Sequence, residues 1–102
     1  MSKYLPWKNF EGDIVRLFKG LGFSDAKRNI EQSRTPSGRD VLNVQPYCVQ
    51  CKYGKPHIKK AWQEANTEAK SGEIPVAFTR FRKEQLTLVT MSVKDFKWLI
   101  SK

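Results

Sequence analysis

The sequence has few residues of the kinds that bind zinc or form redox centres. It contains two cysteines, Cys48 and Cys51, and one histidine, His57. A structural zinc site needs four ligands, and only His57 is near enough in sequence to join the thiols. A strand over residues 47–53 would also point the two thiols to opposite faces, which opposes a disulfide. We therefore expect reduced, buried thiols, with no zinc site and no redox pair.

Long apolar segments are also missing. No run approaches the ~20 residues that cross a bilayer. The N-terminal sequence MSKYLPWKNF has neither a continuous apolar segment nor a small-residue cleavage site. We therefore expect no membrane span, no signal peptide and a cytoplasmic location. The 102 residues suit one domain, 1–102, which is large enough to bury a core.

Acidic residues are scarce relative to basic ones. Asp plus Glu number 10 and Lys plus Arg number 19, which gives a net charge of +9. An excess of this size in a small domain favours a polyanionic partner, most often nucleic acid. The basic residues do not gather on one amphipathic helix, so a membrane surface explains them less well.

Hydrophobic periodicity predicts an alternation of helices and strands. Apolar residues at helical spacing indicate helices over 7–21 and 57–70. Strands are expected over 27–32, 40–44, 47–53, 74–81 and 86–91, with a turn at Gln45–Pro46. Ser92 and Asp95 resemble a capping box that begins a last helix. This order predicts an α/β fold in which helices pack on one mixed sheet.

Alternation along the 47–53 strand separates its side chains into two sets. One face carries Cys48, Gln50 and Lys52, and the other carries Val49, Cys51 and Tyr53. The apolar set is expected to pack under a helix, whereas Gln50 and Lys52 face a polar cleft. Asp40 begins the partner strand of the hairpin, so a carboxylate, an amide and an ammonium group can converge.

This group of atoms suits a hard divalent cation such as Mg²⁺, which prefers oxygen ligands. Asp40 offers a charged oxygen, Gln50 a neutral one, and the main-chain carbonyl of Cys51 a third. Lys52 can orient or help to deprotonate an attacking water, and can offset charge on a phosphate. Spacing alone leaves open the alternative of an ordinary solvent-facing Gln/Lys pair.

The segments "GRD" and "VQCKYG" resemble the PD-(D/E)XK nuclease pattern, in which an acid begins a hairpin and (D/E)-x-K follows on the next strand. A first helix that contains a Glu and ends in "LGF", and a strand of the "IPVAF" kind, agree with it. The chain most resembles the archaeal- and phage-type Holliday junction resolvases, over about residues 7–81. The resemblance implies a restriction-endonuclease-like αβββαβ core with a mixed central sheet flanked by helices.

The resemblance also implies a set of site residues. Glu11 would be the acid of the first helix, Asp40 the main metal ligand and Lys52 the catalytic lysine, with Mg²⁺ or Mn²⁺ as cofactor. Gln50 departs from the family pattern, which has a carboxylate there, so we expect the metal to be held less tightly. Glu64 on the following helix is a candidate replacement, with a solvated helix face as the alternative.

Basic residues flank the proposed site in sequence. They are Arg34, Arg39, Lys55, Lys59 and Lys60. Phosphate contacts from such residues give salt-sensitive affinity that does not depend on base sequence. No segment resembles a recognition helix, so we expect selection of DNA shape.

The leading interpretation is a metal-dependent endonuclease that cuts branched DNA such as four-way junctions. Two symmetric cuts imply a homodimer, and Phe96, Trp98 and Leu99 form a candidate dimer surface. One alternative is a nuclease-fold module that binds DNA without cutting it, with Gln50 marking a lost site. Another is a nuclease that acts on linear or mismatched duplex in restriction or repair.

Overall fold

The computed structural model describes residues 6–30 and 38–102. The elements are α1 (Pro6–Gly20), β1 (Lys27–Arg28), β2 (Val41–Leu42), β3 (Tyr47–Gly54), α2 (Ile58–Glu68), β4 (Ile74–Phe81), β5 (Leu88–Thr90) and α3 (Val93–Ile100). Their order is the predicted one. The first two strands are shorter than expected, and β2 ends before Asn43, whose φ of 65° is incompatible with an extended strand.

The strands form one mixed sheet in the order β1-β2-β3-β4-β5. The central strands β3 and β4 are parallel, in register from Tyr47↔Ile74 to Gly54↔Phe81, and the other pairs are antiparallel. Parallel neighbours need a crossover, which α2 supplies. The predicted α/β class with a mixed sheet is therefore confirmed.

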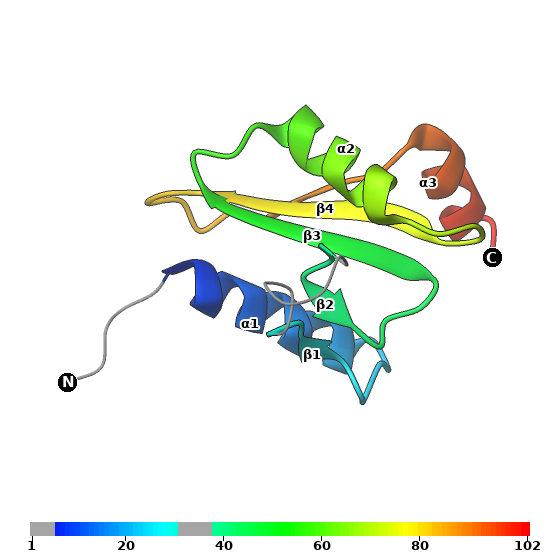
Figure 1. Ribbon diagram of the computed structural model, residues 1–102, viewed down its shortest axis with the longest axis horizontal. Coiled ribbons are helices and arrows are strands. Elements are labelled where there is room, and N and C mark those ends of the chain that lie inside the picture. The colour runs from blue at the N-terminus through cyan, green and yellow to red at the C-terminus, as the bar shows by residue number, and fades with distance from the viewer. Residues whose placement is uncertain (1–5, 31–37) are drawn as a thin grey trace.

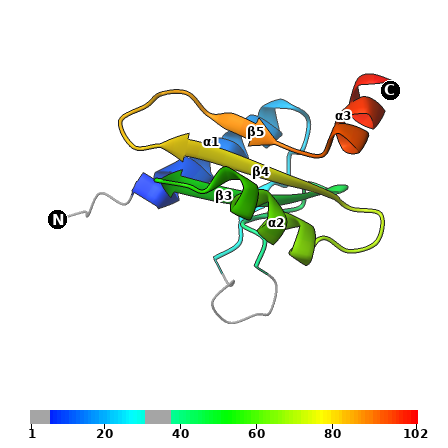
Figure 2. The same cartoon turned by 90° about the horizontal axis from the view of Figure 1, so that it is seen from above.

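Helices α1 and α2 cover opposite faces of the sheet (Figures 1 and 2). The larger apolar core lies on the α1 side, where Phe10, Ile14 and Phe18 pack with inward side chains of β2, β3 and β4. On the other side, α2 buries only Ala61 and Ala65. These small side chains let α2 lie close to the sheet, so that polar residues beside them border the strand surface.

Two helix ends agree with the sequence. Gly22, with φ 107°, follows α1 in the left-handed region that favours glycine. The N–H of Phe23 donates to the carbonyl of Phe18 at 3.0 Å, which completes a Schellman motif. At α3, the Ser92 hydroxyl accepts the N–H of Asp95 at 3.1 Å, as a capping residue does.

The two cysteines are buried and reduced, as predicted. Cys51 belongs to the core on the α1 side, whereas Cys48 is on the alternate face of β3. Burial raises the pKa of the Cys48 thiol, and burial raises that of Cys51 well above its usual value. Both sulfurs therefore remain protonated at neutral pH.

The last helix differs from the others because it buries none of its residues. Its apolar side chains Phe96, Trp98 and Leu99 are 51%, 45% and 36% exposed. In the described part of the chain, no helix combines the length and the apolar character needed to cross a membrane.

Candidate functional site

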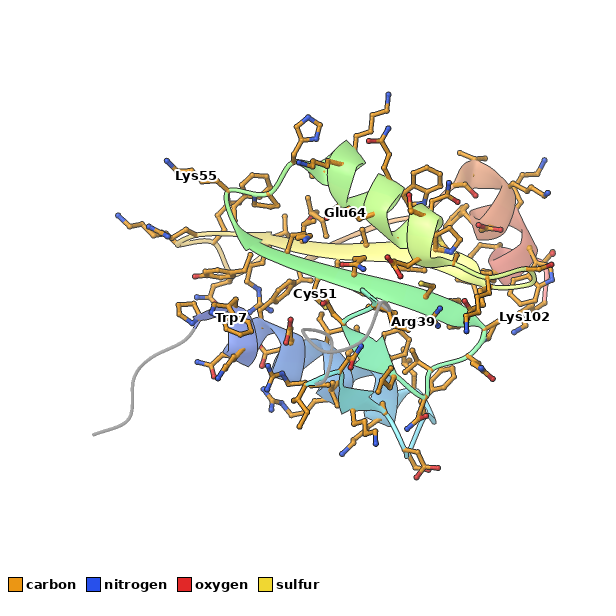
Figure 3. The ribbon with its side chains drawn as sticks, viewed as in Figure 1. Trp7, Arg39, Cys51, Lys55, Glu64 and Lys102 are labelled. Carbon is orange, nitrogen blue, oxygen red and sulfur yellow. The ribbon has the colours of Figure 1, made fainter. Side chains whose placement is uncertain are left out.

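A pocket of about 400 Å³ lies between β3 and α2. Its lining consists of Gly38, Asp40, Gln50, Lys52, Lys60, Gln63, Glu64, Thr67 and Glu68. Three of the predicted site residues, at 40, 50 and 52, therefore border the same space. The strand brings Gln50 and Lys52 to the α2 face, as alternation requires, and Glu64 reaches Lys52 from the helix. Figure 3 shows Glu64 on α2.

Asp40 lies beside the edge of β3, just before β2. Its N–H donates to the carbonyl of Val49 at 2.9 Å, and its Oδ2 accepts the N–H of Cys51 at 2.7 Å. The side chain is buried. Because the N–H and C=O of one strand residue point to the same edge, the carbonyl of Cys51 also points towards Asp40.

Gln50 is held in one orientation by the chain that precedes Asp40. Its amide nitrogen donates to the carbonyl of Gly38 at 2.6 Å, and the residue is only 4% exposed. The N–H of Gly38 in turn donates to Glu68 Oε2 at 2.9 Å. Since the amide nitrogen faces a carbonyl, the amide oxygen is the atom of Gln50 that can accept a hydrogen bond or ligate a cation.

Lys52 and Glu64 form an ion pair across the pocket. Nζ lies 3.5 Å from Oε1 and 3.4 Å from Oε2. Both side chains are more than one third exposed, so the pair contributes little to stability. The pair matters for position, because it holds the Glu64 carboxylate of α2 on the wall of the pocket opposite Gln50.

Glu11 occupies a different environment from the other predicted site residues. Its Oε1 accepts a hydrogen bond from Arg28 Nε at 3.0 Å and forms an ion pair with Arg28, with Nη2 2.9 Å away. Glu11 is buried in α1, on the far side of the sheet from α2, and does not line the pocket. The structure therefore brings together residues 40, 50 and 52, and it leaves Glu11 paired with Arg28.

Arg39 was predicted to contact phosphate, and its guanidinium is engaged within the protein. Its Nη1 and Nη2 donate to the two carboxylate oxygens of Glu73 at 2.7 and 2.8 Å, and Nη2 also donates to the carbonyl of Glu68. The hydrogen bond from Arg39 lowers the pKa of Glu73 to about 2. A phosphate would have to displace this largely buried pair.

Of the other residues predicted to contact phosphate, three are described by the structure and one is not. Lys55, Lys59 and Lys60 are exposed, and Lys60 lines the pocket. Lys55 directly follows β3 (Figure 3). Arg34 lies outside the described residues. All three lysines are therefore accessible to an anion, and one of them, Lys60, borders the pocket.

The sequence predicted part of the helical wall, namely Lys60 and Glu64, and missed Thr67 and Glu68. Lys60, Gln63, Glu64 and Thr67 recur at i, i+3, i+4 and i+7, which is the spacing of one helix face. The same pattern is typical of a solvated surface, and only the packing of Ala61 and Ala65 on the sheet turns it into the border of a pocket.

The pocket offers side-chain oxygen atoms that could bind a metal ion. Among residues 6–30 and 38–102, no three His, Cys, Asp or Glu side chains converge as a metal-binding group. The pocket lining instead offers the carboxylates of Asp40, Glu64 and Glu68 together with the Gln50 amide oxygen. Cys51 does not line the pocket, but its N–H binds Asp40. Hard divalent cations accept such a mixed set and complete it with water.

Neither a scan against protein-family models nor a search of curated proteins found a match to this chain. The chemistry available to the protein therefore follows from the residues that meet at the pocket. These residues come from sequence positions 38–68, that is, from the hairpin and the crossover helix. The local order of the chain is thus enough to assemble them.

Proposed function

We propose that this protein is a metal-dependent endonuclease that hydrolyses phosphodiester bonds in branched DNA. The observation that carries the proposal is the shared pocket of Asp40, Gln50, Lys52 and Glu64. The resemblance of "GRD" and "VQCKYG" to the PD-(D/E)XK nucleases supports the same function. The order α1-β1-β2-β3-α2-β4 supports a restriction-endonuclease-like core around the mixed sheet.

The pocket fits Mg²⁺ or Mn²⁺ because all of its candidate ligands are oxygen atoms. Asp40, Gln50, Glu64 and the main-chain carbonyl of Cys51 would hold the ion. When bound, such a cation lowers the pKa of water and offsets charge on a phosphate. Glu64 would supply the carboxylate that position 50 lacks. Glu11 is not in this set, because it does not line the pocket and its Oε1 is paired with Arg28.

Lys52 has the position of a catalytic lysine. Its ammonium group has three N–H donors, so contact with Glu64 leaves donors for a water or a phosphate oxygen. One donor can orient the attacking water, and another can stabilise the charge that develops on the phosphate. The Gln50 amide is less suited to this, because it carries no positive charge and one of its two N–H donors is bound to Gly38.

Charge and symmetry suggest the substrate. The exposed Lys55, Lys59 and Lys60 can contact phosphates on either side of the cut, independently of base sequence. A four-way junction needs two symmetric cuts, which a two-fold homodimer provides. The exposed apolar side chains of α3, such as Phe96 and Trp98, offer a surface for that dimer.

The experiment is cleavage of a labelled four-way junction with Mg²⁺ or Mn²⁺. We expect specific products from the unchanged protein. Asp40→Asn and Lys52→Ala should each lower the cleavage rate by about 100-fold or more, because each removes a charge that acts in the transition state. Asp25→Asn, in the exposed loop after α1, is the matched control and should cut normally. Cleavage that survives both site variants would refute the proposal.

A second candidate is a nuclease-fold module that binds junctions without cutting them. It is favoured by Gln50, which adds no charge and whose amide nitrogen is used by Gly38. Gln50→Glu separates the two functions, because it restores a carboxylate, although it also loses the bond to Gly38. A gain in cleavage indicates a weakened enzyme. Comparison of junction, flap and linear duplex tests the further alternative of a repair or restriction substrate.

A further inference from the structure

A second group of cations lies at the end of the central strands. Gly54 and Phe81 are the last paired residues of β3 and β4, and the N–H of Arg82 donates to the carbonyl of Gly54 at 2.8 Å. Lys55 and Arg82 therefore follow neighbouring strand ends, and Lys83 comes next in the turn. We call Lys55, Arg82 and Lys83 the basic end. Figure 3 shows Lys55 at the extremity of the molecule opposite Lys102.

The cations of the basic end differ from the structural arginines of this protein. Arg28, Arg39 and Arg80 each pair with a carboxylate at 2.7–2.9 Å. Within the described ranges, no member of the basic end forms an ion pair, and all three are exposed. The three positive charges repel one another, and the adjacent Glu84 forms no ion pair with them among the described residues, so the fold gains little electrostatically from this grouping.

Lys83 has a backbone conformation that is uncommon for a residue with a side chain. Its φ is 70°, and the N–H of Glu84 donates to the carbonyl of Phe81 across the turn. Glycine adopts the left-handed conformation more easily than a residue with a Cβ, so lysine is not the choice that best stabilises this turn. Its exposed side chain offers little packing in return. A function for the charge explains a residue that the turn itself disfavours.

Basic residues lie along the chain between the pocket and the basic end. Lys52 and Lys60 line the pocket, Lys59 lies in the first turn of α2, and Lys55 joins β3 to that helix. We propose that the basic end binds the phosphate backbone of the DNA duplex that leaves the pocket. This proposal rests on the proposed action on DNA. It adds a binding surface, centred on Arg82 and Lys83, that the nuclease resemblance does not assign.

The test measures binding of a four-way junction and of a linear duplex over a series of salt concentrations, in EDTA, with Asp40→Asn as the parent protein. Each lost phosphate contact should lower the salt slope of log K by about 0.9. Arg82→Gln with Lys83→Gly should therefore reduce the slope by about 2 and weaken binding about tenfold at low salt. Lys70→Gln with Lys102→Gln removes equal charge at the other end and should leave the slope unchanged.

Lys83→Gly alone distinguishes binding from folding. We expect it to keep or raise the melting temperature, because glycine suits φ 70°, and at the same time to weaken DNA binding. Equal slopes for the basic-end and control pairs would overturn the inference, even where the unchanged protein cuts junctions. Loss of slope in a protein that never cuts would support the inference and reject the nuclease. Absence of DNA binding by the parent would reject the inference.

Discussion

The ammonium group of Lys52 on β3 lies 3.4 Å from the carboxylate of Glu64 on α2. The two residues are on opposite walls of the candidate site, and the parallel pairing of β3 with β4 holds these walls together through the crossover. A lysine and a carboxylate are both needed for the proposed chemistry. Their proximity before any ligand binds means that little rearrangement is required.

Glu64→Gln is expected to weaken metal binding without unfolding the protein. The exposed pair with Lys52 is worth no more than about 1 kcal/mol, so the stability should change little. Loss of one of two carboxylates should reduce the affinity for Mn²⁺ about tenfold or more. Calorimetric titration with Mn²⁺ measures this. Glu84→Gln serves as the control, and equal Mn²⁺ affinity in both variants would contradict a ligand role for Glu64.

Glu73 should make the protein sensitive to acid. Arg39 lowers the pKa of Glu73 from 4.5 to about 2, so the folded state binds the proton less well than the unfolded state. The stabilisation is complete above about pH 4.5 and is lost as the pH falls towards 2, which amounts to about 3 kcal/mol. Urea unfolding at several pH values measures it.

Glu73→Gln should remove this part of the pH dependence. It should also lower stability at neutral pH, because the largely buried guanidinium of Arg39 loses its carboxylate partner. The two unfolding curves should therefore approach each other near pH 2. Parallel curves for the variant and the unchanged protein across pH 2–5 would show that the pair is not the cause.

Thr79→Val is expected to stabilise the protein. Thr79 is paired with Lys52 across β3 and β4, is 0% exposed, and its hydroxyl has no hydrogen-bond partner among the described residues. Replacing an unsatisfied hydroxyl by a methyl group of similar size should raise the unfolding free energy by about 1 kcal/mol. The opposite control is Thr87→Val, since Thr87 Oγ1 accepts two bonds from Arg80. Destabilisation by Thr79→Val would indicate a hidden partner.

Local signals account for the parts of the fold that the sequence predicts. The end of α1 at Gly22 and the cap at Ser92 depend on residues within one turn. The alternation of Gln50 and Lys52 depends only on the period of a strand. The shared face of β3 and the element order follow from such patterns, and the structure agrees with them.

Distant partners account for what the sequence does not predict. Arg39 and Glu73 are 34 residues apart, so nothing in the local pattern separates this structural arginine from a phosphate-binding one. The pairing of Glu11 with Arg28, which are 17 residues apart, has the same origin. Glu64 could be predicted only in part. Helical spacing shows which face of the helix carries it, but not which part of the protein that face covers.

The Asp40 carboxylate accepts a hydrogen bond from the N–H of Cys51. Asp40 therefore has two roles, because it satisfies a donor at the edge of β3 and is also a ligand of the proposed ion. Without an acceptor there, β3 would offer an unsatisfied donor just before β2 begins, and such edges recruit strands from other molecules. Asp40→Ala would thus combine loss of a ligand with a tendency to self-associate. Asp40→Asn keeps an oxygen at the edge, so its catalytic effect can be measured on a monodisperse sample.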